Sequence, residues 1–476
     1  MNKIAIIGAG ASGVAALRQA VEQGLDPTVF EARASIGGAW ILANANHDRS
    51  AECCSISFDA DRVANVAISQ SAFTLFDDDK FSFPTSTPMY PSLRTNVPTL
   101  LMQYNGISFP PATQLFPGPN VVENYISDAA SNFLEFFQFN THVSTLRWTT
   151  KDDAGDQRRW TLETQSTLDF NSRIESYQFD FVIIANGHYQ KPYIPFIEGL
   201  DSFPHDITHA RFYHSADSFA KKNVLVVGSN ASGYDITREI AESIVKKQVT
   251  DTDSVMKIYQ SRKSLSPTGE NFDGPENADW CKIITVLPTI SKIQGPDIAF
   301  CNGTILSNID TIIFATGYYF SFPFANQIYA PFNEFPLTKQ VPLPNGTVSK
   351  QHRDGGLRVH YLDSRDIFYL PDPTLALIGL PYHVLPLSLA QIQSRVAIKY
   401  FTKQINLEFQ VGTPEEYPET REALVYGHPK QYDVHDALLK EIGEGGEGDG
   451  LYCKTPQYIR DLRVGAFSLR RAVLGY

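Results

Sequence analysis

Two glycine-rich stretches have the residue types and spacing of dinucleotide-binding turns. The first is Gly8-Ala9-Gly10-Ala11-Ser12-Gly13, and the second, more than 200 residues later, is Gly228-Ser229-Asn230-Ala231-Ser232-Gly233. A strand that stops on glycine and restarts as a helix aims its backbone N–H groups and positive helix end at a pyrophosphate. Two such turns in one chain predict two bound dinucleotides, and two dinucleotides are typical of a redox relay.

The first turn lies in a complete sequence context. An apolar run at residues 4–7 precedes it, and the pattern after it predicts a helix over 14–21 and a second strand over 27–31. Glu31 stands at the tip of that strand, 18 residues after Gly13, near the ~20-residue interval at which an acid meets a ribose hydroxyl. This context predicts a nucleotide site, and the alternative is a glycine turn that only packs a helix on a sheet.

A second glycine pair favours FAD over NAD at this first site. Gly37-Gly38 is followed by Ala39 and Trp40. The pair would let the backbone approach the flavin side of the cofactor, and Trp40 would supply an apolar wall. From the residues alone, a plain turn followed by a core tryptophan is also open.

The second turn departs from the pattern because Asn230 replaces the middle glycine. Asparagine tolerates left-handed backbone better than other residues, so we expect the turn to survive. An amphipathic helix over 234–245 and a strand over 255–259 should follow. The strand ends on a hydroxylic and cationic tip that contains Ser261 and Arg262, which fits a 2′-phosphate and predicts NADPH over NADH. The alternative for this tip is a solvated loop.

Composition and charge exclude several classes of protein. The 476 residues can hold roughly two to four structural units, and the net charge of −12 argues against nucleic acid or an anionic membrane as the main partner. No apolar run approaches the ~20 residues of a membrane span, and the first predicted strand leaves no room for a signal peptide. The five cysteines are odd in number and irregularly spaced, which favours a reducing compartment, so we expect a cytoplasmic protein.

Five further segments add motifs in a recognisable order. They are Leu-Arg-Thr-Asn-Val-Pro at 93–98, the strand and turn at 181–188, the stretch at 203–213, the Ala-Thr-Gly-Tyr segment ending at 318, and Pro-Leu-Ser-Leu-Ala-Gln at 386–391. Together with the two turns, they make the chain resemble the flavin-containing monooxygenases, of the soluble fungal and bacterial type of class B flavoprotein monooxygenases. The stretch at 203–213 matches the F-x-G-x-x-x-H-x-x-x-Y motif of that family, except that His205 occupies the glycine position. The segment at 386–391 fits its P-x-x-E-x-Q-like pattern loosely.

The resemblance implies an α/β fold with two Rossmann-like dinucleotide-binding domains. A smaller NADPH-binding domain, residues 201–311, would be inserted into a larger discontinuous FAD-binding domain, residues 1–200 and 312–476, whose second part carries substrate-lining loops. The residues implied for FAD are Gly8, Gly10, Ala11, Ser12, Gly13, Glu31, Gly38, Ala39, Trp40, Thr95, Asn96 and Gln391. Those implied for NADPH are Gly228, Ser229, Asn230, Ser232, Gly233, Ser261 and Arg262.

The resemblance also implies an activity. NADPH would reduce FAD, O₂ would form a C4a-hydroperoxyflavin, and a nitrogen or sulfur nucleophile of a small molecule would take up oxygen. Asn96, facing flavin and nicotinamide, is the candidate catalytic residue, whereas His209 and Tyr213 belong to a motif at the hinge between domains. No carboxylate or cysteine cluster accompanies the neighbouring histidines, so we expect no metal. A homodimer would be typical of the family.

Three alternatives stay open from the sequence. A flavin disulfide reductase shares the two-nucleotide architecture, but it needs a redox dithiol, and Cys53-Cys54 is adjacent rather than C-x-x-C. A Baeyer–Villiger-type oxygenase is a nearer alternative. A non-catalytic NADP(H)-binding flavoprotein is the third, because Asn230 and His205 both depart from family positions.

Overall fold

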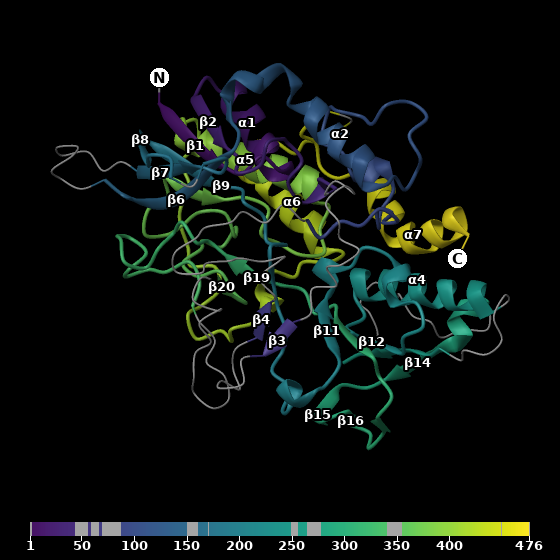
Figure 1. The fold of residues 1–476 in the computed structure, drawn as a ribbon. Helices are drawn as coiled ribbons and strands as arrows, with labels where there is room; N and C mark the ends of the chain where they lie inside the picture. The colour runs from purple at the N-terminus through teal and green to yellow at the C-terminus, as the bar shows by residue number, and fades with distance from the viewer. Residues whose placement is uncertain are drawn as a thin grey trace.

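The structure is a computed structural model of the chain. It describes residues 2–42, 56–58, 66–68, 87–149, 160–169, 171–248, 256–263, 278–339, 355–448 and 450–475. Two five-stranded parallel sheets organise these residues, and helices pack on both of them (Figure 1). The predicted α/β fold with two Rossmann-like sheets is confirmed.

The first sheet has the strand order β21-β9-β1-β2-β5. Its strands are β1 (Lys3–Ile7), β2 (Asp26–Phe30), β5 (Phe137–Gln138), β9 (Phe181–Ile184) and β21 (Leu375–Leu377). Ile7, the last residue of β1, pairs with Phe30 on one side and Ile184 on the other. All pairings are parallel, so the carboxyl ends of these strands meet at one edge, where ligands of such sheets bind.

The second sheet repeats this order as β11-β18-β12-β13-β14. Its strands are β11 (Asp206–His209), β12 (Val224–Val227), β13 (Ile258–Ser261), β14 (Ile284–Leu287) and β18 (Thr311–Phe314). Val227, the last residue of β12, pairs with Ser261 and with Phe314, as Ile7 does with its two partners. Strand β12 therefore corresponds to β1, β13 to β2 and β18 to β9.

The place of β18 bears on the predicted domain division. This strand pairs with β11 and β12 in the second sheet, and a division after residue 311 would cut it. The segment ending in Ala315-Thr316-Gly317 thus returns to the first sheet only after the strand has ended. We therefore propose the same inserted arrangement with its second boundary moved to residue 314.

A three-stranded antiparallel sheet is inserted in the chain within each parallel sheet, between β5 and β9 in the first and between β14 and β18 in the second. The first comprises β6 (Thr141–Trp148), β7 (Trp160–Ser166) and β8 (Glu175–Phe179), and the second comprises β15 (Ile290–Gln294), β16 (Asp297–Phe300) and β17 (Ile305–Leu306). The remaining strands are β3 (Ile56–Phe58), β4 (Val66–Ile68), β10 (Lys191–Pro192), β19 (Tyr318–Ser321) and β20 (Gly355–Gly356). Strands β10 and β19 pair where the chain crosses between the two parallel sheets.

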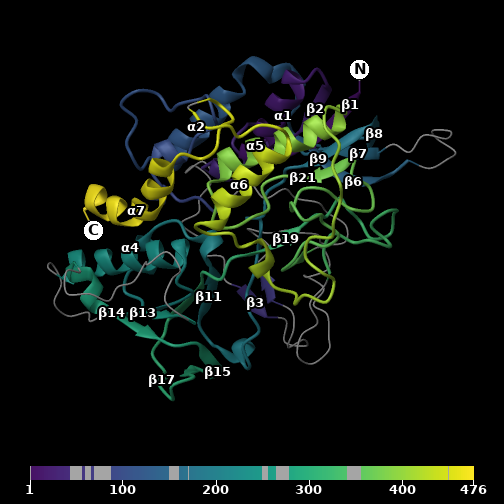
Figure 2. The same cartoon turned by 180° about the vertical axis from the view of Figure 1, so that it is seen from behind.

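The helices cover the first sheet and reach over to the second. The α-helices are α1 (Ala11–Glu22), α2 (Pro119–Ala129), α4 (Ala231–Gln248), α5 (Pro386–Phe401), α6 (Lys430–Glu441) and α7 (Gln457–Leu474). Short 3₁₀ helices include Gly38–Trp40, Thr99–Leu101, Ala210–Phe212, Asp279–Ile283 and Arg421–Leu424. Seen from behind, α5 and α6 lie against the first sheet, and α7 extends toward α4 (Figure 2). Helices α1 and α4 begin three residues before the positions predicted for them.

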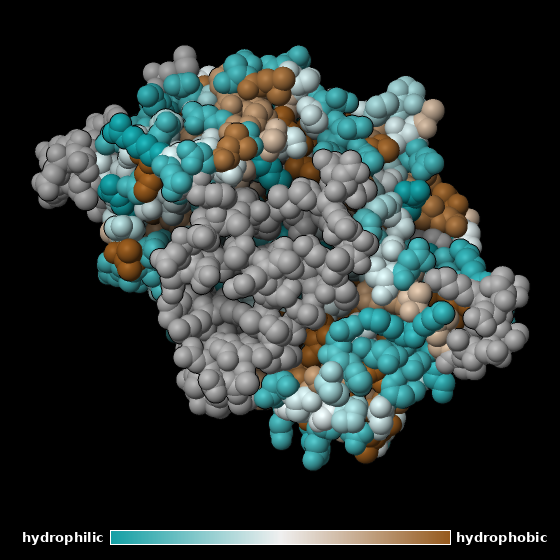
Figure 3. All heavy atoms as spheres, in the orientation of Figure 1, coloured by the Kyte–Doolittle hydropathy of each residue, from teal (hydrophilic) through white to brown (hydrophobic). Residues whose placement is uncertain are grey.

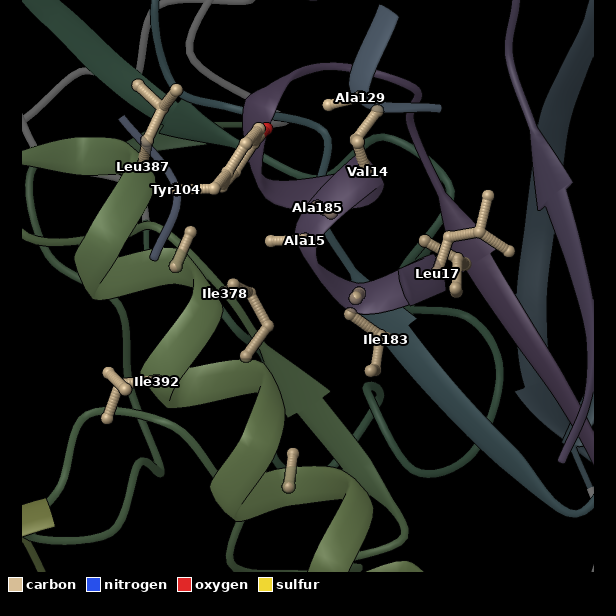
Figure 4. Packing of buried hydrophobic residues seen from close by; sticks show 14 of the residues in the cluster. Val14, Ala15, Leu17, Tyr104, Ala129, Ile183, Ala185, Ile378, Leu387 and Ile392 are labelled. Carbon is tan, nitrogen blue, oxygen red and sulfur yellow. The ribbon is translucent and has the colours of Figure 1, made fainter. Parts of the chain in front are cut away.

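Small apolar residues let α1 pack closely on α5. Ala15 and Ala16 of α1, like Ala390 and Ala397 of α5, are almost fully buried. Figure 4 shows side chains of this cluster: Ala15 points from α1 toward α5, and Ile378 lies between the two helices. This packing fixes the start of α1, which is the end of the first glycine turn.

The surface is mixed in character. On the coloured part of the face in Figure 3, hydrophilic residues predominate and hydrophobic ones form small groups. Within the described ranges, no helix combines the length and apolar character needed to span a membrane.

Candidate functional site

The first glycine turn owes two of its three glycines to backbone packing. Gly8 has φ +104°, and a Cβ there would lie 2.7 Å from Ala185 O, beyond the end of β9. A Cβ on Gly13 would overlap the carbonyl oxygen of Gly8. These contacts hold α1 directly on the end of β1, so any side chain at either position displaces the helix.

Backbone packing does not explain glycine at the middle position of this turn, Gly10. A Cβ on Gly10 would lie 3.4 Å from Gly38 Cα, which is ordinary van der Waals contact, so packing alone does not demand glycine there. A Cβ on Gly38, at φ +59°, would in contrast lie 2.7 Å from Gly10 Cα. The second glycine pair thus packs on the turn, as its position in the sequence suggested. Packing therefore explains glycine at position 38 but does not demand it at position 10, and bare backbone at Gly10 fits the close approach of a dinucleotide pyrophosphate.

Glu31 lies at the tip of β2, beside the turn. Its buried carboxylate accepts hydrogen bonds from the N–H of Ala9 (2.8 Å) and the N–H of Arg33 (2.9 Å). Two backbone donors fix the carboxylate at the strand end, where the ribose of a dinucleotide is expected.

Arg33 adds a donor that sequence reasoning missed. Its Nε and Nη2 are buried and have no hydrogen-bond partner among the described residues, and burial lowers the pKa of its guanidinium while Glu31 raises it. Buried donors without acceptors are costly, so this position fits a ligand that supplies acceptors, as the nucleotide end of FAD would. A cation two residues after the strand-tip acid was the available signal.

A third segment, more than 350 residues later in the chain, also contacts the first turn. After β21, Gly379 adopts φ +81°, and a Cβ there would overlap the side chain of Ser12. The N–H of Gly379 donates to Oε1 of the buried Gln393 (3.0 Å). This approach was also missed, although the apolar run before Gly379 stops on glycine as the two recognised turns do.

The second turn repeats the first. Gly228 has φ +119°, and its Cβ would overlap Ala315 O, just as the Cβ of Gly8 would crowd Ala185 O. A Cβ on Gly233 would overlap Gly228 O. Two glycines of the second turn therefore meet the same packing requirement as their counterparts in the first.

The departure at Asn230 has a simpler explanation than the expected one. Asn230 is exposed and has no positive φ, and its carbonyl accepts from Tyr234 N (2.9 Å) as the Gly10 carbonyl accepts from Val14 N (3.0 Å). The turn is kept, as expected, but Asn230 needs no left-handed backbone to keep it. Asparagine is accommodated because the side chain points to open space in ordinary backbone geometry.

Arg262 occupies the position in the second site that Glu31 occupies in the first. Gly228 N donates to Ser261 O (2.9 Å) as Gly8 N donates to Phe30 O (2.9 Å). Arg262 directly follows Ser261 at the end of β13, as Glu31 directly follows Phe30 at the end of β2. Arg262 is half-buried there. The two sites thus place opposite charges at equivalent strand tips.

Ser261 is placed differently from the expectation. Its hydroxyl is buried and donates to Pro288 O (2.9 Å). A hydroxyl has one proton, so this hydrogen bond leaves none to donate to a phosphate. The structure therefore assigns Ser261 to holding β13, and the 2′-phosphate hypothesis rests on Arg262.

The segment around Asn96 forms a turn next to a cavity. Thr95 is buried, and its hydroxyl donates to Val97 O (2.9 Å), whereas the Asn96 side chain is exposed and makes no hydrogen bond within the described chain. Thr95 therefore makes the turn and leaves the Asn96 amide available. A cavity of about 500 Å³, lined by Arg94, Gln114 and Asn120 among others, opens beside this segment.

Gln391 is placed to hold backbone rather than to face a flavin. Its Oε1 accepts from Asn105 N (2.6 Å), and its Nε2 donates to Asn105 O (3.3 Å). Next to that residue, the Tyr104 hydroxyl donates to Ala11 O (2.6 Å) in the first turn. Gln391 thus orders the segment that leads from Asn96 back to the first turn.

The histidine motif lies at the crossing between the sheets. His209 Nδ1 accepts from Arg211 N (3.1 Å), so Nε2 carries the proton and donates to Gly317 O (3.0 Å). Burial lowers the pKa of His209 to about 3, which keeps the ring neutral. Tyr213 is also buried, and its hydroxyl donates to Glu239 (2.8 Å). His205, at the usual glycine position, is exposed and has no positive φ, so no glycine is needed there.

Cysteine and metal chemistry find little support in the described residues. Cys281, Cys301 and Cys453 are free thiols, and Cys53-Cys54 lies outside the described residues. The described ranges contain no group of three or more metal-ligating side chains that could hold an ion.

The comparisons with known proteins agree with this geometry. The family model described as flavin-binding monooxygenase-like matches residues 1–85, 76–263 and 270–344, more than half of the chain. The chain is 26% identical to flavin-containing monooxygenase ustF2 of Aspergillus flavus over 92% of this chain and 91% of that protein. It is 29% identical to the thiol-specific monooxygenase of Saccharomyces cerevisiae over 67% of this chain and 66% of that protein.

Solved structures show the same fold. S-allyl-L-cysteine S-oxygenase from Allium sativum superposes with a TM-score of 0.69 at 22% identity, covering 99% of this chain and 93% of that one. Tmm from a Pelagibacter strain gives a TM-score of 0.64 at 20% identity, covering 97% and 89%. With the family match and the two nucleotide-type turns, these likenesses identify a monooxygenase that uses flavin and nicotinamide cofactors. The chain belongs to the flavin-binding monooxygenase-like family.

Proposed function

We propose that this protein is an FAD-, NADPH- and O₂-dependent monooxygenase that oxygenates a nitrogen or sulfur atom of a small molecule. The observation that carries the cofactor assignment is the reversal of charge between the two equivalent strand tips. Glu31 suits the ribose hydroxyls of FAD, and Arg262 suits the 2′-phosphate of NADPH. Sulfur is the preferred nucleophile, since the names of a relative and of a structural neighbour specify thiol and thioether oxidation.

The first site would hold FAD through its turn, its strand tip and two further segments. Gly10 and Gly38 supply the bare backbone, Glu31 and Arg33 face the nucleotide end, and Gly379 borders the turn at Ser12. The helix α1 N-terminus has no acidic residue in its first turn, so its positive end is left for an anion.

The second site would hold NADPH in the equivalent way. Gly228 and Gly233 bring α4 onto the end of β12, and α4 also lacks an acidic residue in its first turn. Arg262 lies at the adjacent strand tip, where a charge-assisted hydrogen bond to phosphate would discriminate against NADH.

A bound flavin, once reduced, supplies the activation of O₂ and the transfer of one oxygen atom. The residues of this chain would bind and orient the reactants and keep water away. Asn96 carries an amide that can donate one hydrogen bond and accept another, so it suits a position between flavin and nicotinamide. A cavity of about 500 Å³ near this segment, lined by Arg94 but not by Asn96, has the size of a small-molecule site.

The proposal is tested first by the absorption spectrum of the purified protein. We expect a yellow protein that releases one FAD per chain on denaturation and consumes O₂ when NADPH is added. A small thioether, a tertiary amine and a cyclic ketone, offered in parallel, separate sulfur, nitrogen and Baeyer–Villiger oxygenation by their products. A protein that binds NADPH but consumes none with any of the three would be the non-catalytic alternative.

A further inference from the structure

A buried arginine of the C-terminal helix contacts the segment that carries Asn96 (the Asn96 segment, residues 90–104). Arg470 of α7 is 1% exposed. Its Nε donates to Thr95 O (3.1 Å), and its Nη2 donates to Arg94 O (3.2 Å). The two carbonyls just before Asn96 in the chain are thus both bound by one guanidinium, which fixes the backbone that aims the Asn96 side chain.

The same guanidinium reaches the second nucleotide unit. Nη2 of Arg470 also donates to both carboxylate oxygens of Asp235, at 3.0 and 2.9 Å, and Asp235 is 4% exposed. Asp235 lies on α4, two residues after Gly233 of the second turn. A single side chain from the C-terminal helix therefore joins the Asn96 segment to the N-terminal part of α4, just beyond its first turn.

Further contacts tie the same segment to α4. The Tyr90 hydroxyl donates to Asp235 (3.3 Å), and the Ser92 hydroxyl donates to Glu239 (2.9 Å). In both ribbon views, α7 lies beside α4 (Figures 1 and 2). Tyr90 and Ser92 thus anchor the start of the Asn96 segment on α4 of the second unit. Tyr104 anchors its other end on the first glycine turn.

A buried ion pair is weak evidence for stability, because desolvation offsets much of the attraction. Its value here lies in geometry: a planar guanidinium can bind two carbonyls and one carboxylate at fixed angles, which an ammonium cannot. Of the residues in α7, only Ala466 and Arg470 are buried. Arg470 is therefore the one buried polar side chain of α7, whereas the polar contact of Arg460 with α6 is half-buried.

We infer that Arg470 is a positioning residue that couples the second nucleotide site to Asn96. Movement of the α4 N-terminus on nicotinamide binding would pass through Asp235 and Arg470 to the backbone at Thr95. The inference rests on the proposed function of Asn96, and it adds a structural role for the C-terminal helix in that function.

Hydrogen exchange tests the anchoring without any enzymatic readout. Thr95 N donates to Pro117 O (3.1 Å), so its exchange reports local opening of the segment. In Arg470→Lys, we expect amides in a peptide covering 93–102 to exchange about tenfold faster, which corresponds to about 1.4 kcal/mol. Asp235→Asn should also make amides of this peptide exchange faster. It provides a second test of the anchoring if Arg470→Lys does not fold.

Arg460 provides the matched control on the same helix. It pairs with Asp436 on α6 (2.6 Å) and so anchors α7 away from the Asn96 segment. Arg460→Lys should leave exchange of the 93–102 peptide unchanged. Equal acceleration in the two lysine variants, or none in Arg470→Lys, would overturn the inference.

Coupling of NADPH use to oxygenation tests the link to Asn96. Arg470→Lys should retain its flavin but divert more NADPH-derived electrons into hydrogen peroxide, and Arg460→Lys should not. In an Asn96→Ala background, Arg470→Lys should add nothing further; a full additional increase would show that Arg470 does not act through Asn96 and would overturn the inference. A wild-type protein that fails to oxidise NADPH with O₂ would refute the proposed function, while the exchange experiment would still decide the anchoring.

Discussion

The two glycine turns share one architecture but differ at the positions that would face a ligand. In both, the first glycine backs onto an alanine carbonyl beyond a neighbouring strand, and the third backs onto the carbonyl of the first. They differ at the middle position, Gly10 against Asn230, and at the strand tip, Glu31 against Arg262. The shared positions are those that pack helix on strand, and the differing ones are those that would face a ligand.

This contrast separates structural glycines from ligand-facing ones. Glycine is required at positions 8 and 228 because the backbone there has a positive φ and lies close to a carbonyl oxygen. At position 10, in contrast, a Cβ would fit, although the residue is glycine. The first site thus keeps a bare backbone at Gly10 that packing alone does not require, which suits the close approach of a pyrophosphate. The second lacks that glycine at its middle position, as expected for a ligand bound less intimately there.

The largest expected effect is at the third glycine of each turn. Gly13→Ala and Gly233→Ala both place a Cβ on a backbone carbonyl that cannot move away. We expect each to lose its own nucleotide and to destabilise the fold by ~1–3 kcal/mol or more. Flavin absorbance reports on the first, and nicotinamide titration on the second. Gly465→Ala on α7, where nothing lies within 4 Å, should be harmless; losses of equal size there would refute the packing argument.

The strand-tip charges should give the next largest effect. Arg262→Ala should raise the Michaelis constant for NADPH roughly ten- to a hundredfold and leave that for NADH nearly unchanged, because one charge-assisted contact to phosphate is lost. Ser261→Ala is the matched control, since its hydroxyl proton is bound by Pro288 O, and it should keep the preference for NADPH. Equal losses with both nucleotides in Arg262→Ala would make Arg262 a structural residue.

Exchanging the middle residues tests the comparison directly. Gly10→Asn, which copies the second turn, should fold normally but bind flavin about tenfold more weakly or worse, which is ~1.4 kcal/mol. Asn230→Gly, which copies the first turn, should bind NADPH nearly as the wild type does. Flavin content after gel filtration and nicotinamide titration measure the two. Full flavin retention in Gly10→Asn would show that the bare backbone is not a ligand surface.

Substituting Asn96, which lies on the segment anchored to both units, should change FAD binding little but should clearly change how NADPH oxidation is coupled to oxygenation. An aspartate of similar size cannot donate a hydrogen bond and would put a negative charge beside an electron-rich reduced flavin. Asn96→Asp should keep near-normal FAD and divert NADPH oxidation into hydrogen peroxide, which a peroxide assay measures. If Asn96→Asp and Asn96→Ala both keep tight coupling, Asn96 has no role in the active site.

The smallest effect on cofactor binding and chemistry is expected at the crossing between the two sheets, where His209 affects stability instead. Burial holds the pKa of His209 at about 3, below its unfolded value, so the unfolded chain binds a proton that the folded chain excludes as the pH falls from about 6.5 toward 3. Stability should therefore fall on acidification by ~1.4 kcal/mol per pH unit for this group. His209→Gln should flatten the slope between pH 6.5 and 5 in urea unfolding. An unchanged slope would mean that the His209 ring is protonated in the folded protein.

Local patterns sufficed for much of the fold. The apolar runs ending on Gly8 and Gly228, with the amphipathic segments after them, predicted both turns and the helices that follow. Glu31 and Arg262 were found because a strand tip lies at a fixed distance along the chain from its turn. The family resemblance added the order of the domains.

Contacts between distant segments were beyond such reasoning. Gly379 meets Ser12, and Arg470 meets Thr95, across more than 350 residues of sequence. The hydroxyl of Ser261 and the amide of Gln391 have the right chemistry for a ligand, but backbone groups elsewhere in the fold bind them first. The conformational tolerance of asparagine does not explain Asn230, because its backbone is ordinary and its side chain is exposed.

The place of β21 in the first sheet has a consequence for synthesis on the ribosome. All five strands of the second sheet lie within residues 206–314, whereas the first sheet needs residues 375–377 for its edge strand and α5 beyond them. During translation, the inserted unit can therefore complete its core while the N-terminal unit is still waiting for its last strand. Because domains tend to fold as units during synthesis, the N-terminal turn would acquire its full surroundings last, although it leaves the ribosome first.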